Sequence, residues 1–304
     1  MTAIEVFAPA KINLTLHVTG QRADGYHLLD SLVAFAPVGD RLILQPGNVT
    51  SLTVEGPEAR GVPADMENIA MRAAMMAPDG QSVTMVLTKF LPVASGIGGG
   101  SADAAAAFRG MLMFGDEAEV PADSVWAMPQ IIHQTYAKAL LDLGADVPMC
   151  LRPRPLRAQG IGEKIEFLDL PALPAVFVNP RVPVSTPEVF RALKSKTNPP
   201  MPDRLPDFAS TVDLIDFLAG CRNDLEPVAR TLVPEIGLTL DALSACDGCE
   251  LSRMSGSGAT CFGIFSSVDS GKAAVDRLRH LYPDYWIAGG LVGDQLQRSM
   301  PVRK

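Results

Sequence analysis

A run of glycines lies between a predicted strand and an alanine-rich segment, and it is the pattern with the clearest chemical use. The stretch Gly96-Ile97-Gly98-Gly99-Gly100-Ser101 removes side chains where a backbone must approach a ligand closely. We predict that Ser101 caps the following helix and that Asp103 lies in its first turn, so that unpaired N–H groups point toward the loop. Such a helix start can bind phosphate without a lysine. The alternative interpretation is a flexible glycine-rich turn with an ordinary serine cap.

This loop differs from two common phosphate-binding patterns. No lysine follows the glycines, as it does in the Gly-x4-Gly-Lys-Ser/Thr loop. The strict Gly-x-Gly-x-x-Gly setting of a dinucleotide-binding fold near the N-terminus is also missing from the sequence. The chemistry must therefore depend on residues elsewhere in the chain.

Composition and charge limit the class of protein. The chain has 304 residues, 47% apolar and 20% charged, which is ordinary for a globular protein with one large domain or two modest ones. Its net charge of −8 disfavours general nucleic-acid binding, which needs Lys and Arg to neutralise phosphates. The sequence shows neither a run of about 18 apolar residues nor a signal-peptide pattern. We therefore expect a cytoplasmic protein that binds neither nucleic acid nor a membrane.

The cysteines suit a reducing compartment better than a disulfide framework, because five of them, an odd number, are scattered along the chain. Cys246 and Cys249 form one C-x-x-C, but no matching histidine pair lies near it, whereas a structural zinc normally has four ligands. A metal or redox role for these two residues is the less favoured interpretation.

The first half of the chain is predicted to form mostly strands. Alternating apolar and polar residues predict strands at 4–8 and 12–18, divided by a turn at Pro9-Ala10-Lys11. Further strands are predicted at 41–45, 51–55 and 83–87, and a helix at 68–77. A strand, the glycine loop and a helix therefore follow one another in order.

The second half is predicted to form a separate unit. Seven prolines make 151–187 an extended, turn-rich stretch, and we place a domain boundary at residue 152. This gives an N-terminal domain, 1–152, and a C-terminal domain, 153–304. The second is expected to contain helices at 211–218, 226–246 and 270–282 and strands at 261–265 and 286–290, so the fold class is α+β.

Three separated segments resemble, in order, the motifs of the galactokinase, homoserine kinase, mevalonate kinase and phosphomevalonate kinase (GHMP) superfamily. They are Pro9-Ala10-Lys11-Ile12-Asn13-Leu14, the loop from Pro92 to Ala106, and Ser255-Gly256-Ser257-Gly258-Ala259-Thr260-Cys261-Phe262. The resemblance implies a two-domain GHMP kinase fold with the active site in the interdomain cleft. It also implies an ATP-dependent small-molecule kinase that uses Mg²⁺. The sequence departs mildly from the motifs at Ser95, Ile97 and Ser257.

Two further segments are similar to one family of this superfamily, which phosphorylates the 2-hydroxyl of 4-diphosphocytidyl-2-C-methyl-D-erythritol in the non-mevalonate isoprenoid pathway. They are Gly20-Gln21-Arg22-Ala23-Asp24-Gly25-Tyr26-His27 and Leu143-Gly144-Ala145-Asp146-Val147-Pro148. The resemblance implies a cytidine diphosphate-linked alcohol as substrate and a monomer or weak homodimer.

The same resemblance implies the catalytic pair. Asp146 would act as the base for the attacking hydroxyl, and Lys11 would lie beside it, keep it ionised and stabilise the transferring group. The alternatives, taken singly, are a turn or cap aspartate and a solvated lysine at a strand end.

For the cytosine, the resemblance implies a sandwich between the rings of Tyr26 and Phe190, with His27 bonded to the base edge. Ile161 would help to hold the base. The alternative is that Tyr26 and Phe190 are core aromatics and His27 is a satisfied buried histidine.

The remaining implied contacts complete the site. Substrate contacts also include Asn13, Thr186, Gly256 and Gly258. The ATP contacts are Asn68, Pro92, Val93, Ala94, Ser95, Gly96, Ile97, Gly98, Gly99, Gly100, Ser101 and Asp103. No protein ligand for Mg²⁺ is assigned, and Arg152, Arg154 and Arg157 are more simply a solvated surface run than a pyrophosphate site.

Three other functions compete with this interpretation. Another GHMP kinase, such as a homoserine or mevalonate kinase, is not expected to carry the Asp-Gly-Tyr-His segment. A nucleotide-binding protein without catalysis would not need Lys11 together with Asp146. A scaffold is disfavoured by the absence of a long amphipathic stripe or a charged tail.

Overall fold

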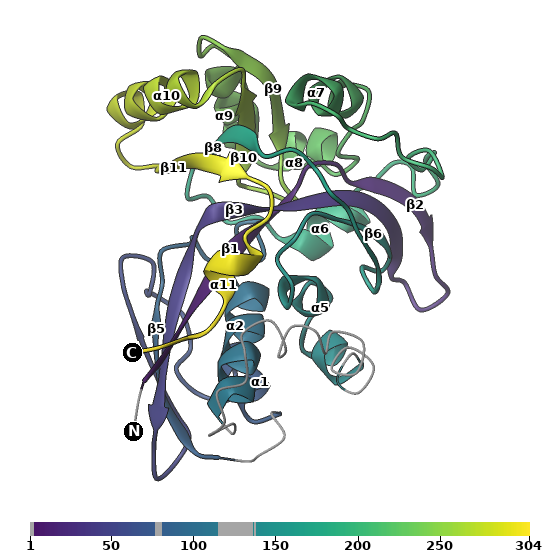
Figure 1. Cartoon of the computed structure of the whole chain (residues 1–304). Coiled ribbons are helices and arrows are strands. Elements are labelled where there is room, and N and C mark those ends of the chain that lie inside the picture. The colour runs from purple at the N-terminus through teal and green to yellow at the C-terminus, as the bar shows by residue number, and fades with distance from the viewer. Residues whose placement is uncertain (1–2, 77–80, 115–135, 137) are drawn as a thin grey trace.

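Two β-sheets, each with its own helices, make up the protein (Figure 1). The structure is a computed structural model that describes residues 3–76, 81–114, 136 and 138–304. Within these residues, one sheet has eight strands and the other has four. The mixture of helices and antiparallel strands confirms the predicted α+β class. No helix in the described part of the chain is long and apolar enough to cross a membrane.

The larger sheet is built on one long strand, β3 (His27–Pro46). The second half of β3 pairs with β1 (Ile4–Asn13) and β5 (Val83–Thr88), and its first half pairs with β2 (His17–Gln21) and β6 (Leu156–Gly160). Three shorter pairings complete the sheet: β4 (Ser51–Glu55) on β5, β7 (Lys164–Phe167) on β6, and β12 (Val302–Arg303) on β1. Strand β3 therefore links the part of the sheet formed with β1, β4 and β5 to the part formed with β2, β6 and β7, and Tyr26 lies in the turn between β2 and β3.

The predicted turn at residues 9–11 is wrong, because this segment lies inside the single strand β1. The register of β1 against β3 shifts between Pro9 and Lys11, as at a β-bulge. Proline lacks an N–H for the ladder, and a bulge accommodates that without ending the strand.

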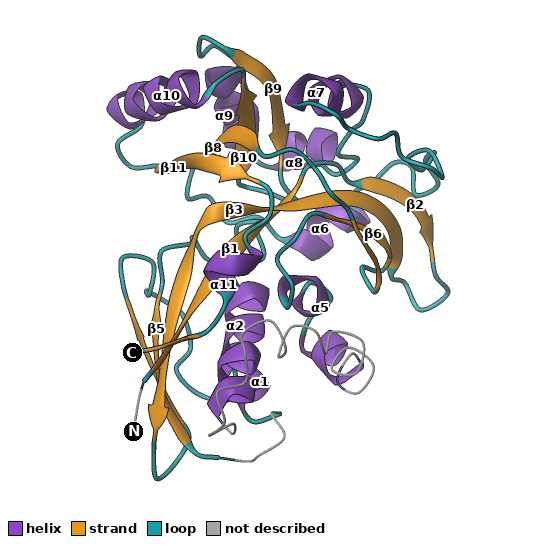
Figure 2. Cartoon of the chain, in the orientation of Figure 1, coloured by secondary structure: helices purple, strands orange, loops and turns teal. Residues whose placement is uncertain are grey.

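Helices cover one face of the larger sheet (Figure 2). Helices α1 (Ile69–Ala74) and α2 (Gly99–Phe114) pack together and against the sheet, and the short α5 (Val147–Cys150) packs on α2. The buried alanines of α2, 102 and 104–107, let its backbone approach β1 closely. The helix predicted at 68–77 is shorter in the structure, with Asn68 as its cap, and residue 77 lies outside the described residues.

The smaller sheet has the strand order β11 (Trp286–Val292), β8 (Leu173–Asn179), β10 (Cys261–Phe265) and β9 (Cys249–Met254). Helices α9 (Pro234–Ser244) and α10 (Val268–Leu281) pack on it. The other helices after β8 are α6 (Thr186–Arg191), α7 (Thr211–Ala219), α8 (Glu226–Leu232) and α11 (Leu296–Ser299).

The single helix predicted at 226–246 is wrong. Helix α8 ends at Leu232 and α9 begins at Pro234, with Val233 in a non-helical conformation between them. The ring of Pro234 is compatible with the first helical position but not with the interior of a helix. The proline therefore ends one helix and begins another.

Strands β6, β7 and β12 follow residue 152 in the chain but pair within the larger sheet. The two sheets thus do not divide the chain at one position. The domain boundary between residues 152 and 153 stays a prediction.

Candidate active site

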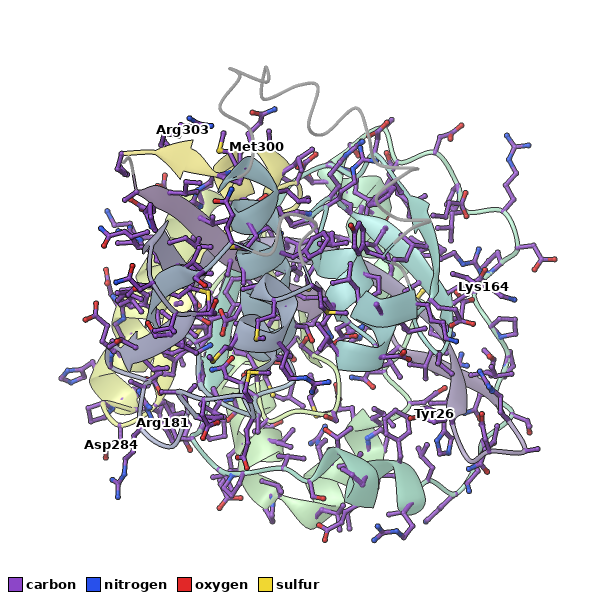
Figure 3. The ribbon with its side chains drawn as sticks, turned by 90° about the horizontal axis from the view of Figure 1, so that it is seen from below. Tyr26, Lys164, Arg181, Asp284, Met300 and Arg303 are labelled. Carbon is purple, nitrogen blue, oxygen red and sulfur yellow. The ribbon has the colours of Figure 1, made fainter. Side chains whose placement is uncertain are left out.

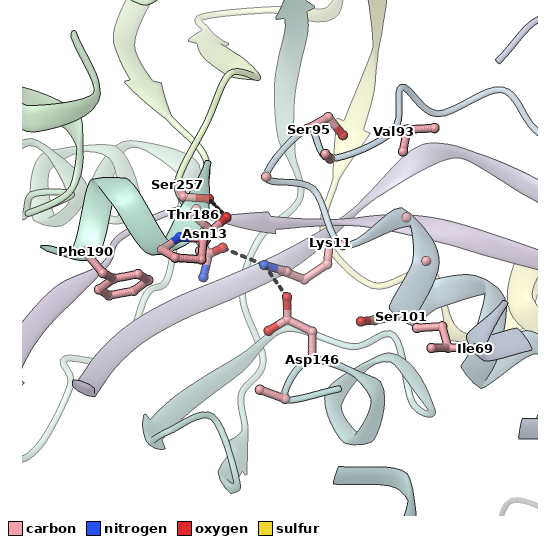
Figure 4. Close-up of a pocket in the computed structure, with 18 of the residues that line it drawn as sticks. Lys11, Asn13, Ile69, Val93, Ser95, Ser101, Asp146, Thr186, Phe190 and Ser257 are labelled. Atoms are coloured by element: carbon pink, nitrogen blue, oxygen red, sulfur yellow. Dashed lines mark hydrogen bonds and ion pairs between the residues drawn. The ribbon is translucent and has the colours of Figure 1, made fainter. Parts of the chain in front are cut away.

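The Lys11 side chain lies between Asp146 and Asn13, at the centre of a pocket (Figure 4). Its Nζ atom is 2.9 Å from Asp146 Oδ2 and donates a hydrogen bond of 2.7 Å to Asn13 Oδ1. Lys11 is buried, with 4% of its surface exposed, so it is not a solvated strand-end lysine. Asp146 precedes α5 but makes no capping hydrogen bond with its side chain. Both residues therefore direct their charges at the pocket and at each other.

Asn13 is fixed from two sides. Its Nδ2 donates to Ser31 Oγ at 2.8 Å, and its backbone N–H donates to Ser255 Oγ at 3.1 Å. Ser255 belongs to the third glycine motif, so this bond joins β1 to a segment 242 residues later in the chain. The position of Asn13 beside Lys11 thus depends on both halves of the protein.

The glycine loop crosses above this pair, and its backbone takes conformations that favour glycine. Gly96 and Gly98 have φ angles of +77° and +66°. A Cβ atom on Gly98 would lie 3.1 Å from Lys11 Cε, and one on Gly96 would lie 2.5 Å from the carbonyl oxygen of Ser255. Only residues without side chains allow this approach to Lys11 and to the third glycine motif.

The predicted positions of Ser101 and Asp103 in the helix need correction. Helix α2 begins at Gly99, so Ser101 lies inside its first turn instead of capping it, and Asp103 lies one turn further along. Glycine has a low helix propensity. Here Gly98, Gly99 and Gly100 line the pocket at the start of the helix, where backbone N–H groups have no partner within the helix. The prediction of an N–H-rich helix start is unaffected by this shift.

Backbone contacts from distant segments hold the loop. The carbonyl oxygens of residues 95, 96 and 97 accept hydrogen bonds from Thr260 N, Ser255 Oγ and Lys11 N, at 3.1, 3.1 and 2.9 Å. Because these carbonyls already accept hydrogen bonds from other segments, the N–H groups of the loop are the backbone groups left to bind a ligand. The loop is therefore not a free, flexible turn.

A buried charge cluster lies under the loop, and the sequence analysis missed it. Lys89 Nζ contacts a carboxylate oxygen of Asp40 and lies 2.6 Å from Asp103 Oδ2. The exposed fractions of the three residues are only 4%, 0% and 3%. Burial raises the pKa of Asp103, Lys89 opposes this and Asp40 adds to it, so that its pKa stays well above the usual range. The only sequence signal for Lys89 was its position two residues after the predicted strand at 83–87.

The pocket has a volume of about 1030 Å³ and joins the predicted nucleotide and substrate residues. Every predicted site residue lines it except Ile97 and Gly258. Ile97 is fully buried in the core behind the loop, and the N–H of Gly258 bonds back to Ser255 O within the third glycine motif. These two residues therefore support the site without facing it.

The aromatic end of the pocket differs from the predicted arrangement. The ring stacked on Phe190 is that of His27, with ring centroids 4.8 Å apart and an interplanar angle of 27°. Tyr26 is 61% exposed and lies on the opposite side of the molecule from Arg181 in Figure 3. Neither Tyr26 nor Phe190 is a fully buried core aromatic, and both line the pocket, although His27 covers one face of the Phe190 ring.

His27 presents a free polar atom there. Its Nε2 is buried and has no hydrogen-bond partner. Burial lowers the pKa of His27, and the Lys196 ammonium lowers it further, which keeps the imidazole neutral. A neutral imidazole with an unused nitrogen is suited to the edge of a base. Thr186 Oγ1 lies 2.6 Å from Ser257 Oγ and joins α6 to the third glycine motif.

At the other end of the pocket, Asn68 has a local structural role. Its Oδ1 accepts from Ala70 N at 2.9 Å as the cap of α1, and its Nδ2 donates to Pro63 O at 2.8 Å. Asn68 thus shapes the loop whose residues Gly61, Val62 and Pro63 line the pocket.

Sequence reasoning also missed two cations near Phe190. Arg191 and Lys196 both line the pocket, and Lys196 Nζ donates to Gln21 Oε1 at 3.0 Å. Their positions one and six residues after Phe190 were the only sequence signal.

The expected surface cluster of arginines is wrong for Arg157. This residue is 3% exposed and forms a two-point ion pair with Asp30, with both N···O distances 2.7 Å. Arg154 does pair with exposed acids, Asp169 and Asp294, as a surface residue would. None of Arg152, Arg154 and Arg157 lines the pocket.

In the described residues, no group of three or more His, Cys, Asp or Glu side chains is placed to hold a metal ion. The thiols of Cys246 and Cys249 bond to the carbonyls of Ala242 and Leu251. Burial raises the pKa of each thiol, to about 11 for Cys249, which keeps both protonated. These features give no support to a reactive C-x-x-C.

Comparisons with known proteins agree with the fold. The family model for the GHMP kinase N-terminal domain matches residues 68–153, and the model for the GHMP kinase C-terminal domain matches residues 210–284. A homoserine kinase structure from Cytophaga hutchinsonii has the same fold, with a TM-score of 0.64 at 18% identity over 99% of this chain and 97% of that one. The fold and the site define an ATP-dependent small-molecule kinase of the two-domain GHMP type.

More similar relatives narrow the assignment. A 4-diphosphocytidyl-2-C-methyl-D-erythritol kinase from Roseobacter denitrificans is 51% identical over 98% of this chain and 96% of its own length. The corresponding protein of Agrobacterium fabrum is 49% identical over 92% and 93%. A crystal structure of 4-(cytidine 5'-diphospho)-2C-methyl-D-erythritol kinase has a TM-score of 0.70 at 34% identity, over 95% of this chain and 99% of that one. The chain belongs to the 4-diphosphocytidyl-2-C-methyl-D-erythritol kinase family.

Proposed function

We propose that the protein transfers the γ-phosphoryl group of ATP to the 2-hydroxyl of 4-diphosphocytidyl-2-C-methyl-D-erythritol, a step of the non-mevalonate isoprenoid pathway. One observation carries the proposal. The ion pair of buried Lys11 with partly exposed Asp146 lies within a single pocket that has the glycine loop at one end and the His27–Phe190 rings at the other. This is the order of groups that a nucleotide, a reacting hydroxyl and a cytosine require.

In this mechanism, Asp146 Oδ2 orients the substrate hydroxyl and accepts its proton as the new O–P bond forms. The bond between the γ-phosphorus and its bridging oxygen breaks, and ADP leaves. Lys11, whose Nζ lies 2.9 Å from Asp146 Oδ2, stabilises the negative charge on the transferring group. Asn13 accepts a hydrogen bond from Lys11 and so fixes the direction of its ammonium.

The glycine loop would hold the ATP phosphates through its backbone N–H groups, helped by the positive end of the α2 dipole. Mg²⁺ would enter this site bound to the nucleotide, because it binds phosphates and keeps several waters and so does not need a complete set of protein ligands. When bound, it neutralises charge on the phosphates.

The cytosine would be gripped at the Phe190 end. His27 Nε2 supplies a hydrogen bond to the base edge, and Ile161 supplies an apolar contact. Since His27 covers Phe190, a base sandwiched by Tyr26 and Phe190 requires the His27 ring to turn aside, or else the base packs beyond it. Arg191 and Lys196 are suited to the diphosphate of the substrate.

Three further features are proposed with this function. The enzyme works in the cytoplasm, it is a monomer or a weak homodimer, and residues 1–152 and 153–304 are its two domains.

The test is Mg²⁺-dependent ADP release with 4-diphosphocytidyl-2-C-methyl-D-erythritol, homoserine and mevalonate supplied separately at equal concentrations. Turnover confined to the cytidine compound would support both the chemistry and the base pocket. Turnover with another alcohol alone would overturn the proposed substrate and leave the kinase. The expected product is phosphorylated at the 2-hydroxyl, which phosphorus NMR distinguishes from the other positions.

A further inference from the structure

The charge cluster of Lys89, Asp40 and Asp103 connects the two ends of the phosphate loop. Asp40, on β3, accepts hydrogen bonds through Oδ1 from Phe90 N and Leu91 N, at 2.6 and 2.9 Å, just before the loop begins. Asp103 lies on α2, four residues after the first helical residue, Gly99, and its Oδ2 accepts a hydrogen bond from Lys89. Lys89 Nζ joins the two carboxylates. The loop is thus closed at its base by one ammonium.

The ammonium of Lys89 is close to the loop itself. A Cβ atom on Gly99 would lie 3.6 Å from Lys89 Nζ, and both Lys89 and Asp103 line the pocket. The backbone of Lys89 contributes further, since its N–H donates to Glu55 O at 2.7 Å and its carbonyl accepts from Glu58 N at 3.2 Å. The backbone of Lys89 is therefore held on both sides, and its side chain is held by the two carboxylates.

The composition of the cluster is unusual for its location. Two carboxylates share one ammonium directly under the place where phosphates would bind, and Asp103 Oδ1 is buried without a partner. Burying a carboxylate oxygen without a hydrogen bond costs free energy, so its presence here indicates a function. Burial would favour a protonated Asp103, so that the cluster carries no net charge toward the phosphates.

We propose that Lys89 and Asp103 are positioning residues for ATP: their contact with Asp40 fixes the spacing between the two ends of the phosphate loop and so aligns its N–H groups with the phosphates. The inference rests on the proposed nucleotide role of the loop. It assigns no contact with the substrate alcohol to either residue. Its consequence is that the cluster determines ATP affinity with little effect on the cytidine end of the pocket.

The experiment measures ATP binding by calorimetry in the presence of Mg²⁺, together with KM for each substrate and the melting temperature. In Asp103→Ala, which removes the link between Lys89 and α2, we expect ATP to bind roughly tenfold more weakly, because small misplacements of positioned groups are costly. KM for the cytidine substrate should stay within twofold of the wild-type value. Asp103→Asn keeps an oxygen for Lys89 and the shape of the side chain, so it should recover most of the lost affinity.

The matched control is Asp30→Asn. Asp30 and Arg157 form an equally buried pair on β3 and β6, outside the pocket lining. Its loss should lower the melting temperature without changing the dissociation constant for ATP. If Asp103→Ala does not fold, Asp103→Leu removes the same link while filling the space of the side chain and leaving the buried Lys89–Asp40 ion pair in place, and the same loss of affinity is expected.

Wild-type affinity for ATP in folded Asp103→Ala, or in the variant that replaces it, would overturn the inference, as would an equal loss of affinity in Asp30→Asn. A parallel rise in KM for both substrates would also overturn it, because it would indicate a general structural defect. The binding measurement uses no alcohol substrate. A failure of the proposed function, seen as no wild-type turnover of the cytidine compound, is therefore distinguishable from a failure of this inference.

Discussion

The Lys11 ammonium contacts Asp146 across 2.9 Å although the two residues lie on different elements, one inside strand β1 and one at the start of α5. Gly98 fits over the pair because it has no side chain. Helix α2, which packs on both β1 and α5, holds the two elements at this separation. The two charges are thus positioned by the same helix whose first turn lines the pocket.

We predict that Asp146→Asn lowers kcat by 10²- to 10⁴-fold, the usual contribution of a general base. KM for both substrates should change only a few-fold, because Asp146 would act mainly in the transition state. Steady-state kinetics with ADP detection measures this. Asp142→Asn, an exposed residue outside the pocket lining, is the control. Unchanged kcat in Asp146→Asn would remove its role as the base.

Gly98→Ala is predicted to reduce kcat at least tenfold. The alanine would carry a side chain at φ +66° and bring Cβ to 3.1 Å from Lys11 Cε, so Lys11 must move from Asp146. Gly61→Ala provides the comparison, since Gly61 also has a positive φ, +80°, but no atom lies within 4 Å of its added Cβ. Equal losses of kcat in the two variants would mean that backbone strain, not displacement of Lys11, is responsible.

Phe190→Leu is predicted to raise KM for the cytidine substrate by about tenfold or more, because stacking on an aromatic ring contributes about 1–3 kcal/mol per base. KM for ATP should not change. Phe208→Leu removes a ring that packs edge-on against Phe217 outside the pocket, and it controls for loss of stability. Calorimetric titration with CMP gives an independent value. If CMP affinity is the same in both variants, Phe190 does not stack on the base.

The raised pKa of Asp103 predicts a pH-dependent difference in stability. An acid whose pKa is higher in the folded state stabilises the fold fully below its unfolded-state pKa of about 3.9. That contribution is lost as the pH rises toward the folded-state pKa. Because Asn cannot titrate, the free energy of unfolding of Asp103→Asn relative to wild type should increase from about pH 4 upward and then level off.

Urea denaturation at a series of pH values between 4 and 8 measures this difference. Asp142→Asn, at an exposed position, should show an almost constant difference over the same range. A constant difference for Asp103→Asn as well would mean that Asp103 ionises normally under the loop.

The glycine loop shows how much of the structure could be predicted from the sequence. The glycines at 96 and 98–100, the strand before them and the alanines after them are local features, so the loop and its place before a helix were predictable. The exact start of α2 at Gly99 was not, because buried packing against β1 outweighs the low helix propensity of glycine. Likewise, β1 continues through Pro9 because its pairing with β3 tolerates a bulge.

The sequence by itself determined the family, the glycine loop, the α+β class and the choice of Lys11 and Asp146 as candidate catalytic residues. Each of these depends on motifs that are contiguous in the chain. Tertiary structure alone decided the partners that long-range packing brings together. These include the cluster of Lys89 with Asp40 and Asp103, the burial of Arg157 against Asp30, and the His27 ring on Phe190. The physical reason is that the strength of a charge or ring contact depends on burial and geometry, which the spacing of residues along the chain does not encode.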